Sequence, residues 1–154
     1  MIKIDLKLLK QLREETAISI ADCRRALEEV GNEYEKAVEW LRKNGIEKAD
    51  KKSERETMQG MIYSYVHQAG KIASMIELSC ETDFVARTEE FKKLAHEIAM
   101  QVVAMNPKNL EELLNQEYIR DTSKTIRHLI KESIAKMGEN TILKRFIRYE
   151  LGSE

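Results

Sequence analysis

Residues 72–87 read Ile72-Ala73-Ser74-Met75-Ile76-Glu77-Leu78-Ser79-Cys80-Glu81-Thr82-Asp83-Phe84-Val85-Ala86-Arg87, and this stretch decides the fold. It begins as a strand, because every second residue from Ile72 to Cys80 falls on one mostly apolar face. A polar break follows at residues 81–83, then Phe84 and Val85, and a helical pattern begins at Thr88, which is placed to cap the helix. We therefore expect a short strand-to-helix turn that carries an aromatic side chain flanked by carboxylates.

The aromatic residue of this turn, Phe84, admits two interpretations. It can be a plug under the following helix, since apolar residues in turns are often buried. It can also be a contact residue, since connections run over the surface and often carry function. The physical pattern alone leaves both open.

The composition fits one ordinary domain, or one domain with a small appendage, in a chain of 154 residues. Charged residues make up 34% of the chain, and 26 Lys and Arg against 27 Asp and Glu give a net charge of -1. A general binder of phosphate backbones needs clustered Lys and Arg. We therefore expect no nucleic acid among the partners.

Cysteine usage and hydropathy indicate a cytoplasmic protein. Cys23 and Cys80 lie far apart, form no metal-binding spacing and no disulfide framework, and suit a reducing compartment. No stretch reaches the length of a membrane span, and no signal peptide is recognisable. We expect no membrane partner, while a processed import segment stays open.

Residues 1–45 predict a mini-bundle of three short helices that resembles a ubiquitin-associated (UBA-like) module. Asp5, Ser19 and Asn32 are placed to cap the helices, and Asn44-Gly45 is expected to stop the third. A bundle of this size lies near the lower limit for folding alone. It is more plausible as a docking unit than as a catalytic one.

Residues 46–59 carry mixed charges without proline, which predicts a solvated helical linker. A sharper interpretation is a basic recognition patch at Lys48, Lys51 and Lys52. The interleaved acidic residues disfavour that patch.

Residues 60–154 predict an α+β core, a three-stranded antiparallel sheet packed with helices. Strands are expected over 60–67, 72–80 and 141–151, helices over 88–105, 109–118 and 126–137, and a loop over 120–124. Helices on one face of so small a sheet leave the other face partly apolar. We therefore expect a homodimer through the core sheet.

The sequence shows no arrangement of residues that is typical of a catalytic, phosphate-binding or metal site. No glycine-rich phosphate loop is present, and His67, His96 and His128 are scattered without a partner cysteine or a triad arrangement. We predict no catalytic residue, no metal site and no cofactor. A binding protein with two docking surfaces, the mini-bundle and the Asp83-Phe84 turn, is the stronger hypothesis than an enzyme.

Three groups of residues form a distinctive set. They are Leu9-Lys10-Gln11-Leu12-Arg13-Glu14-Glu15-Thr16 with Asp22-Cys23-Arg24-Arg25-Ala26-Leu27 and Ala37-Val38-Glu39-Trp40-Leu41-Arg42-Lys43-Asn44-Gly45; Glu77 to Arg87; and Ile134-Ala135-Lys136-Met137-Gly138-Glu139-Asn140 through Arg145-Phe146-Ile147-Arg148-Tyr149-Glu150. These groups resemble bacterial elongation factor Ts. They touch both ends and the middle of the chain, in the order of the family.

The resemblance implies a guanine nucleotide exchange factor for the translational GTPase elongation factor Tu, not an enzyme in its own right. It implies that the mini-bundle docks on the GTPase through Arg13, Ile20 and Ala21. It implies further that Thr82, Asp83, Phe84 and Val85 form the motif that intrudes beside the nucleotide site. There the Asp-Phe pair disturbs the magnesium and phosphate contacts, so that GDP leaves.

The chain departs from the family pattern in two places. The family usually has Gly-Ala-Gly followed by methionines where this chain has Ala17-Ile18-Ser19-Ile20-Ala21, and the loss of both glycines stiffens the turn. Many members also have a longer core, so this chain resembles a short form with a single core subdomain. The alternative function is a non-catalytic adaptor whose ubiquitin-associated-like module binds helices or ubiquitin-like partners.

Overall fold

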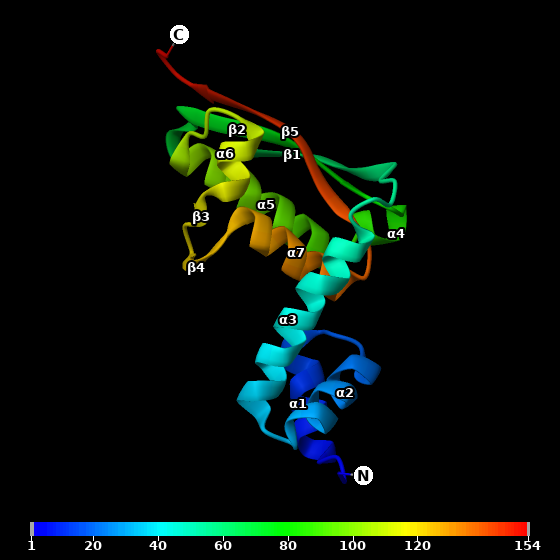
Figure 1. The fold of residues 1–154 in the computed structure, drawn as a ribbon. Helices are drawn as coiled ribbons and strands as arrows, with labels where there is room; N and C mark the ends of the chain where they lie inside the picture. Colours follow the sequence, from blue (N-terminus) through cyan, green and yellow to red (C-terminus); the bar gives the residue numbers. More distant parts are fainter. Residues whose placement is uncertain (1, 154) are drawn as a thin grey trace.

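The computed structural model describes residues 2–153, which form a helical N-terminal module and an α+β core (Figure 1). The module contains α1 (Leu6–Thr16), α2 (Ile20–Val30) and the first part of α3 (Tyr34–Lys52). The side chain of Asp5 caps α1, and that of Ser19 caps α2, as predicted. The helices bury a small apolar cluster of Leu12, Cys23, Ala26, Leu27, Ala37 and Leu41.

Helix α3 does not stop at Asn44-Gly45, so that prediction was wrong. The helix continues through Gly45 to Lys52 and forms most of the connection to the core (Figure 1). A Cβ added to Gly45 would lie 2.7 Å from the Cβ of Ala135 in α7 (Ile126–Met137). The glycine therefore permits a close helix crossing instead of ending the helix.

Asn32 does not cap α3, contrary to the prediction, because the helix begins one residue later, after Glu33. Asn32 has a left-handed φ of 64°. Its side-chain amide donates to the Lys3 carbonyl oxygen at 2.9 Å and its Oδ1 accepts from the Asp5 amide at 3.0 Å. It fastens the segment before α1 to the α2–α3 turn.

The core sheet has the predicted three antiparallel strands. They are β1 (Gln59–Val66), β2 (Ile72–Cys80) and β5 (Thr141–Glu150), in the order β1-β2-β5 with β2 central. A short turn at Gln68–Gly70 joins β1 to β2. Helices α5 (Glu89–Met105) and α7 lie on one side of the sheet (Figure 1).

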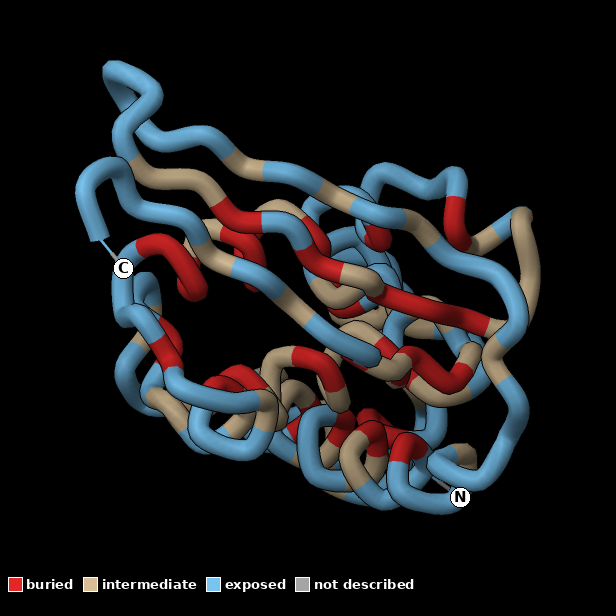
Figure 2. Tube along the Cα trace, turned by 90° about the horizontal axis from the view of Figure 1, so that it is seen from above, coloured by how far each residue is buried: buried red, intermediate tan, exposed pale blue. Residues whose placement is uncertain are grey.

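The core lies between β2 and these helices. On β2 the residues at every second position from Ser74 to Cys80 are buried, which confirms the predicted face. Thr88 caps α5, as predicted, and Phe91 of its first turn is fully buried. The other face of the sheet is largely exposed, and Figure 2 looks down onto the strands from that side.

A second, two-stranded sheet replaces part of a predicted helix and a predicted loop. Helix α6 ends early (Leu110–Asn115), and β3 (Glu117–Tyr118) pairs with β4 (Asp121–Thr125). The reason is tertiary: buried Gln101 donates to the Glu117 carbonyl at 3.0 Å and accepts from the Ile119 amide at 3.1 Å. Such bonds outweigh the local helical pattern. Among the described residues, no helix combines the length and the apolar character needed to cross a membrane.

Candidate functional site

The turn after β2 forms a single helical turn, α4 (Asp83–Ala86). Thr82 precedes it, and its hydroxyl oxygen accepts a hydrogen bond from the Val85 amide at 3.4 Å. Ala86 is buried and Val85 packs against the core, so one side of the turn is anchored. The structure therefore has the predicted strand-to-helix turn.

Phe84 projects from the opposite side of this turn into solvent. Its relative exposure is 80%, which excludes the plug interpretation for the isolated chain. Leaving a Phe side chain in water forgoes about 1.5–3 kcal/mol of burial free energy. An aromatic side chain held out in this way is available to a partner.

Asp83 lies beside Phe84 with its carboxylate half exposed. The Arg87 guanidinium lies 3.0 Å from that carboxylate, and both side chains reach solvent. An exposed ion pair of this kind contributes about 0–1 kcal/mol. Asp83 is therefore free to exchange Arg87 for another partner at little cost.

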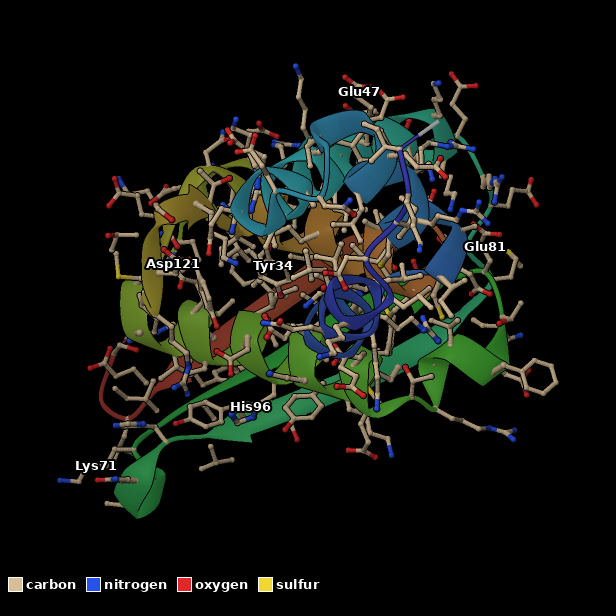
Figure 3. All side chains as sticks on the ribbon, turned by 90° about the horizontal axis from the view of Figure 1, so that it is seen from below. Tyr34, Glu47, Lys71, Glu81, His96 and Asp121 are labelled. Atoms are coloured by element: carbon tan, nitrogen blue, oxygen red, sulfur yellow. The ribbon has the colours of Figure 1, made fainter. Side chains whose placement is uncertain are left out.

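Glu139 also belongs to this site, although sequence reasoning did not assign it a role. Its carboxylate accepts from the Thr82 amide at 2.9 Å and from the Thr82 hydroxyl at 2.8 Å. The two residues lie far apart in sequence, and no local pattern predicts their contact. Figure 3 shows the neighbouring Glu81 at the end of the sheet that carries this turn, opposite Lys71.

The thiol of Cys80 lies under the turn and donates to the Thr82 carbonyl oxygen at 3.1 Å. Burial, with the nearby negative charge of Glu139, raises the pKa of this thiol to about 11. Burial also raises the pKa of the Cys23 thiol. Both cysteines are thus protonated at neutral pH and behave as buried small residues.

The predicted docking residues of the N-terminal module lie around the α1–α2 loop. Arg13 donates from its guanidinium to the Ile18 carbonyl at 2.6 Å, which holds the loop against α1. Ile20 is 60% exposed, and Ala21 beside it is exposed. Arg13 near the end of α1 and Ile20 and Ala21 at the start of α2 therefore flank the α1–α2 loop, and Figure 1 shows α2 and α4 on the same side of α3.

The histidines are only partly scattered. The rings of His67 and His96 both pack against Tyr65, with centroid separations of 6.1 Å and 5.4 Å. His96 bonds to the Tyr63 hydroxyl at 2.9 Å, and Figure 3 shows it beside the strands. Within residues 2–153, no group of three His, Cys, Asp or Glu side chains is arranged to hold a metal ion.

The outer face of the sheet presents a second surface. Met75 of β2 lies opposite Ser64 of β1 and Ile147 of β5, and the next row places Tyr149 beside Ala73. Residues of one row share a face of the sheet. We call the exposed apolar group Ile62, Val66, Met75, Ile147 and Tyr149 the sheet patch.

Comparison with known proteins leads to one family. The family model described as Elongation factor TS matches residues 81–154. Elongation factor Ts of Coprothermobacter proteolyticus is 38% identical over 196 aligned positions, which cover 98% of this chain and 100% of the relative. Elongation factor Ts of Thermotoga petrophila is 41% identical over 194 positions, which cover 98% of each chain.

A third relative, elongation factor Ts of Nitratidesulfovibrio vulgaris, is 39% identical over 196 positions and is covered to 98% of its length. Each of these alignments is longer than the chain of 154 residues, so the relatives carry residues that this chain lacks. The similarity nevertheless spans nearly the whole length of this chain and of each relative. The chain belongs to the bacterial elongation factor Ts family.

Proposed function

We propose that this protein is a guanine nucleotide exchange factor that binds elongation factor Tu and promotes the release of GDP in the cytoplasm. The observation that carries the proposal is Phe84, 80% exposed on a turn whose other side is anchored in the core. The proposed contact residues are Thr82, Asp83, Phe84 and Val85 on the turn, with Arg13, Ile20 and Ala21 on the N-terminal module.

The mechanism requires no bond chemistry from this chain. Magnesium and backbone amides hold a nucleotide phosphate mainly by electrostatics. A protein that binds the nucleotide-free GTPase more tightly than the GDP-bound form shifts that equilibrium by its difference in affinity. The Asp83 carboxylate and the Phe84 ring are suited to compete for the space and charge beside the magnesium ion.

The energetics require two docking surfaces. Full burial of Phe84 in the partner supplies about 1.5–3 kcal/mol, which is roughly one to two decades in an equilibrium constant. That gain alone is too small for a stable complex. The N-terminal module supplies the remaining contacts, because Ile20 offers an exposed apolar side chain beside the loop that Arg13 holds.

The experiment measures release of a fluorescent GDP analogue from elongation factor Tu with and without this chain. The chain should accelerate release, and Phe84→Ala should lower the accelerated rate about tenfold or more. Met105→Ala is a matched control, because Met105 is an exposed apolar residue at the far end of α5. No acceleration by the unaltered chain would remove the proposal.

The alternative, a non-catalytic adaptor, predicts a different result. An adaptor that works through the three-helix module would bind a partner other than the GTPase, and that binding would not respond to Phe84→Ala. The position of Phe84 favours the exchange factor, since an adaptor needs no exposed aromatic residue on the core turn.

We also propose that the protein forms a homodimer through the sheet patch. The patch spans two neighbouring rows, Ser64–Met75–Ile147 and Val66–Ala73–Tyr149, and no helix of the described residues covers this face of the sheet in Figure 2. Ile62 lies in the next row, beside the ion pair between Glu77 and Arg145 at 2.7 Å, which interrupts the apolar surface on that side. Two copies of this face would bury each other's apolar side chains.

A further inference from the structure

The single turn of α4 cannot hold its own shape. It has four residues, and isolated helical segments need about 12–15 residues to be even marginally stable in water. Its most prominent side chain, Phe84, is exposed and contributes no anchoring contact. The direction in which Phe84 points therefore depends on bonds made by the residues before it.

Thr82 makes those bonds through all three of its polar groups. Its amide and its hydroxyl both donate to the Glu139 carboxylate, at 2.9 Å and 2.8 Å, and its carbonyl accepts from Cys80 at 3.1 Å. A hydroxyl has one donor and two acceptor positions. With its proton directed at Glu139, the Thr82 oxygen presents a lone pair to the Val85 amide, which is the cap of α4.

Asn140, the residue after Glu139, makes further hydrogen bonds that hold the same region. Its backbone amide donates to the Glu81 carboxylate at 2.7 Å. Its side-chain amide, in a residue only 2% exposed, donates to the Arg55 carbonyl at 2.8 Å and to the Ser53 carbonyl at 3.3 Å. The loop between α7 and β5 thus joins the end of the connection from α3 to the turn before α4.

We propose that Glu139 is a positioning residue for nucleotide exchange: its carboxylate orients Thr82, and Thr82 holds α4 so that Phe84 points outward. This inference rests on the proposed exchange function. Glu139 itself need not touch the partner. Its role is to keep Phe84 in the direction that insertion requires, so that less ordering is needed at the moment of binding.

The test compares Glu139→Ala and Glu139→Gln with the unaltered chain in the GDP-release assay. Glu139→Ala leaves two donors of Thr82 without their acceptor, and we expect the maximal release rate at saturating factor to fall about tenfold. The half-saturating concentration should change less than about twofold, because the N-terminal contacts remain. Glu139→Gln keeps one of the two acceptor oxygens and loses the other, so it should recover part of the loss, to within about threefold of the unaltered rate.

A double-mutant cycle separates positioning from general destabilisation. If Glu139 acts through Phe84, Glu139→Ala should lower release less than about twofold in a Phe84→Ala background. The matched control is Glu111→Ala, which removes a carboxylate bonded to Arg127 at 2.8 Å and to Asn115 at 3.1 Å. Figure 1 shows α6, which carries Glu111, far from α4, and this control should retain the full rate.

Three results would overturn the positioning role: Glu139→Ala within about twofold of the unaltered rate, a recovery absent in Glu139→Gln, or full additivity with Phe84→Ala. If circular dichroism shows that Glu139→Ala does not fold, Glu139→Gln decides alone. Its release rate should be about threefold below that of the unaltered chain, and Glu139→Gln should have no further effect in a Phe84→Ala background. Failure of the exchange function is distinct, because then the unaltered chain would not accelerate release at all.

Discussion

Gly45 of α3 and Ala135 of α7 meet where the connection from the N-terminal module crosses the core. A Cβ built on Gly45 would lie 2.7 Å from the Ala135 Cβ, closer than two such carbons approach in folded proteins. The crossing therefore depends on there being a Cβ on only one of the two helices at this point of contact. It brings the two modules together by packing instead of by a flexible linker.

Gly45→Ala should destabilise the protein, although alanine is the better helix former. Helix propensity favours alanine by about 1 kcal/mol, while overpacking a tight contact costs about 1–3 kcal/mol. Chemical denaturation should therefore show a lower free energy of unfolding. Adding Ala135→Gly should restore much of the loss by relieving the overlap, and stabilisation by Gly45→Ala alone would contradict the close crossing.

Ala17→Gly should stabilise the N-terminal module. Ala17 follows α1 with φ 56° and ψ 15°, a left-handed conformation that costs an alanine roughly 1–2 kcal/mol. Glycine removes that strain but loses more chain entropy, so the expected gain is about 0.5–1 kcal/mol in thermal or chemical unfolding. The control Ala104→Gly, at an exposed position inside α5, should instead destabilise by a similar amount.

Local features of the fold could be predicted from the sequence, and features set by distant partners could not. Thr88 was recognised as a helix cap because the residues that it caps follow directly. Gly45 was mistaken for a stop because Ala135, which explains it, lies on another helix. Likewise Gln101 holds the β3–β4 hairpin across space. The Asp-Phe turn was recognised from its residues, whereas its support by Glu139 needed the tertiary structure.

High pH should weaken the fold through Cys80. Its pKa is raised to about 11 from an ordinary value near 9.0, because burial and Glu139 disfavour the thiolate. The folded state thus holds the proton more tightly than the unfolded chain, so this contribution to stability is complete below about pH 9 and is lost as the pH rises toward 11. The free energy of unfolding, measured against pH, should fall more steeply across this window for the unaltered chain than for Cys80→Ala. Equal slopes would contradict the shifted pKa.

Met75→Lys should dissociate the proposed homodimer. Met75 lies on the central strand of the sheet patch, opposite Ser64 and Ile147, so a buried dimer interface would have to desolvate the new charge. Sedimentation equilibrium should show the dissociation constant rising at least about tenfold. Met105→Lys, at an exposed apolar residue away from the sheet patch, is the control and should leave the constant unchanged. A monomeric unaltered chain at micromolar concentration would rule out the dimer.

Ile20→Ala should separate docking from exchange. Ile20 is 60% exposed at the start of α2, on a different element from the turn that carries Phe84. A contact that is made equally with the GDP-bound and the nucleotide-free partner strengthens both complexes to the same extent. Its loss therefore raises the half-saturating concentration without changing the maximal rate. We expect the half-saturating concentration to rise about fivefold to thirtyfold for Ile20→Ala, with the maximal release rate within about twofold of that of the unaltered chain.

Phe84→Ala should show the converse, a lower maximal rate with a smaller change in the half-saturating concentration. Leu6→Ala, at an exposed apolar residue at the other end of α1, should change neither quantity. If Ile20→Ala lowered the maximal rate as Phe84→Ala does, the N-terminal module would take part in displacing the nucleotide, and the proposed separation of docking from exchange would be wrong.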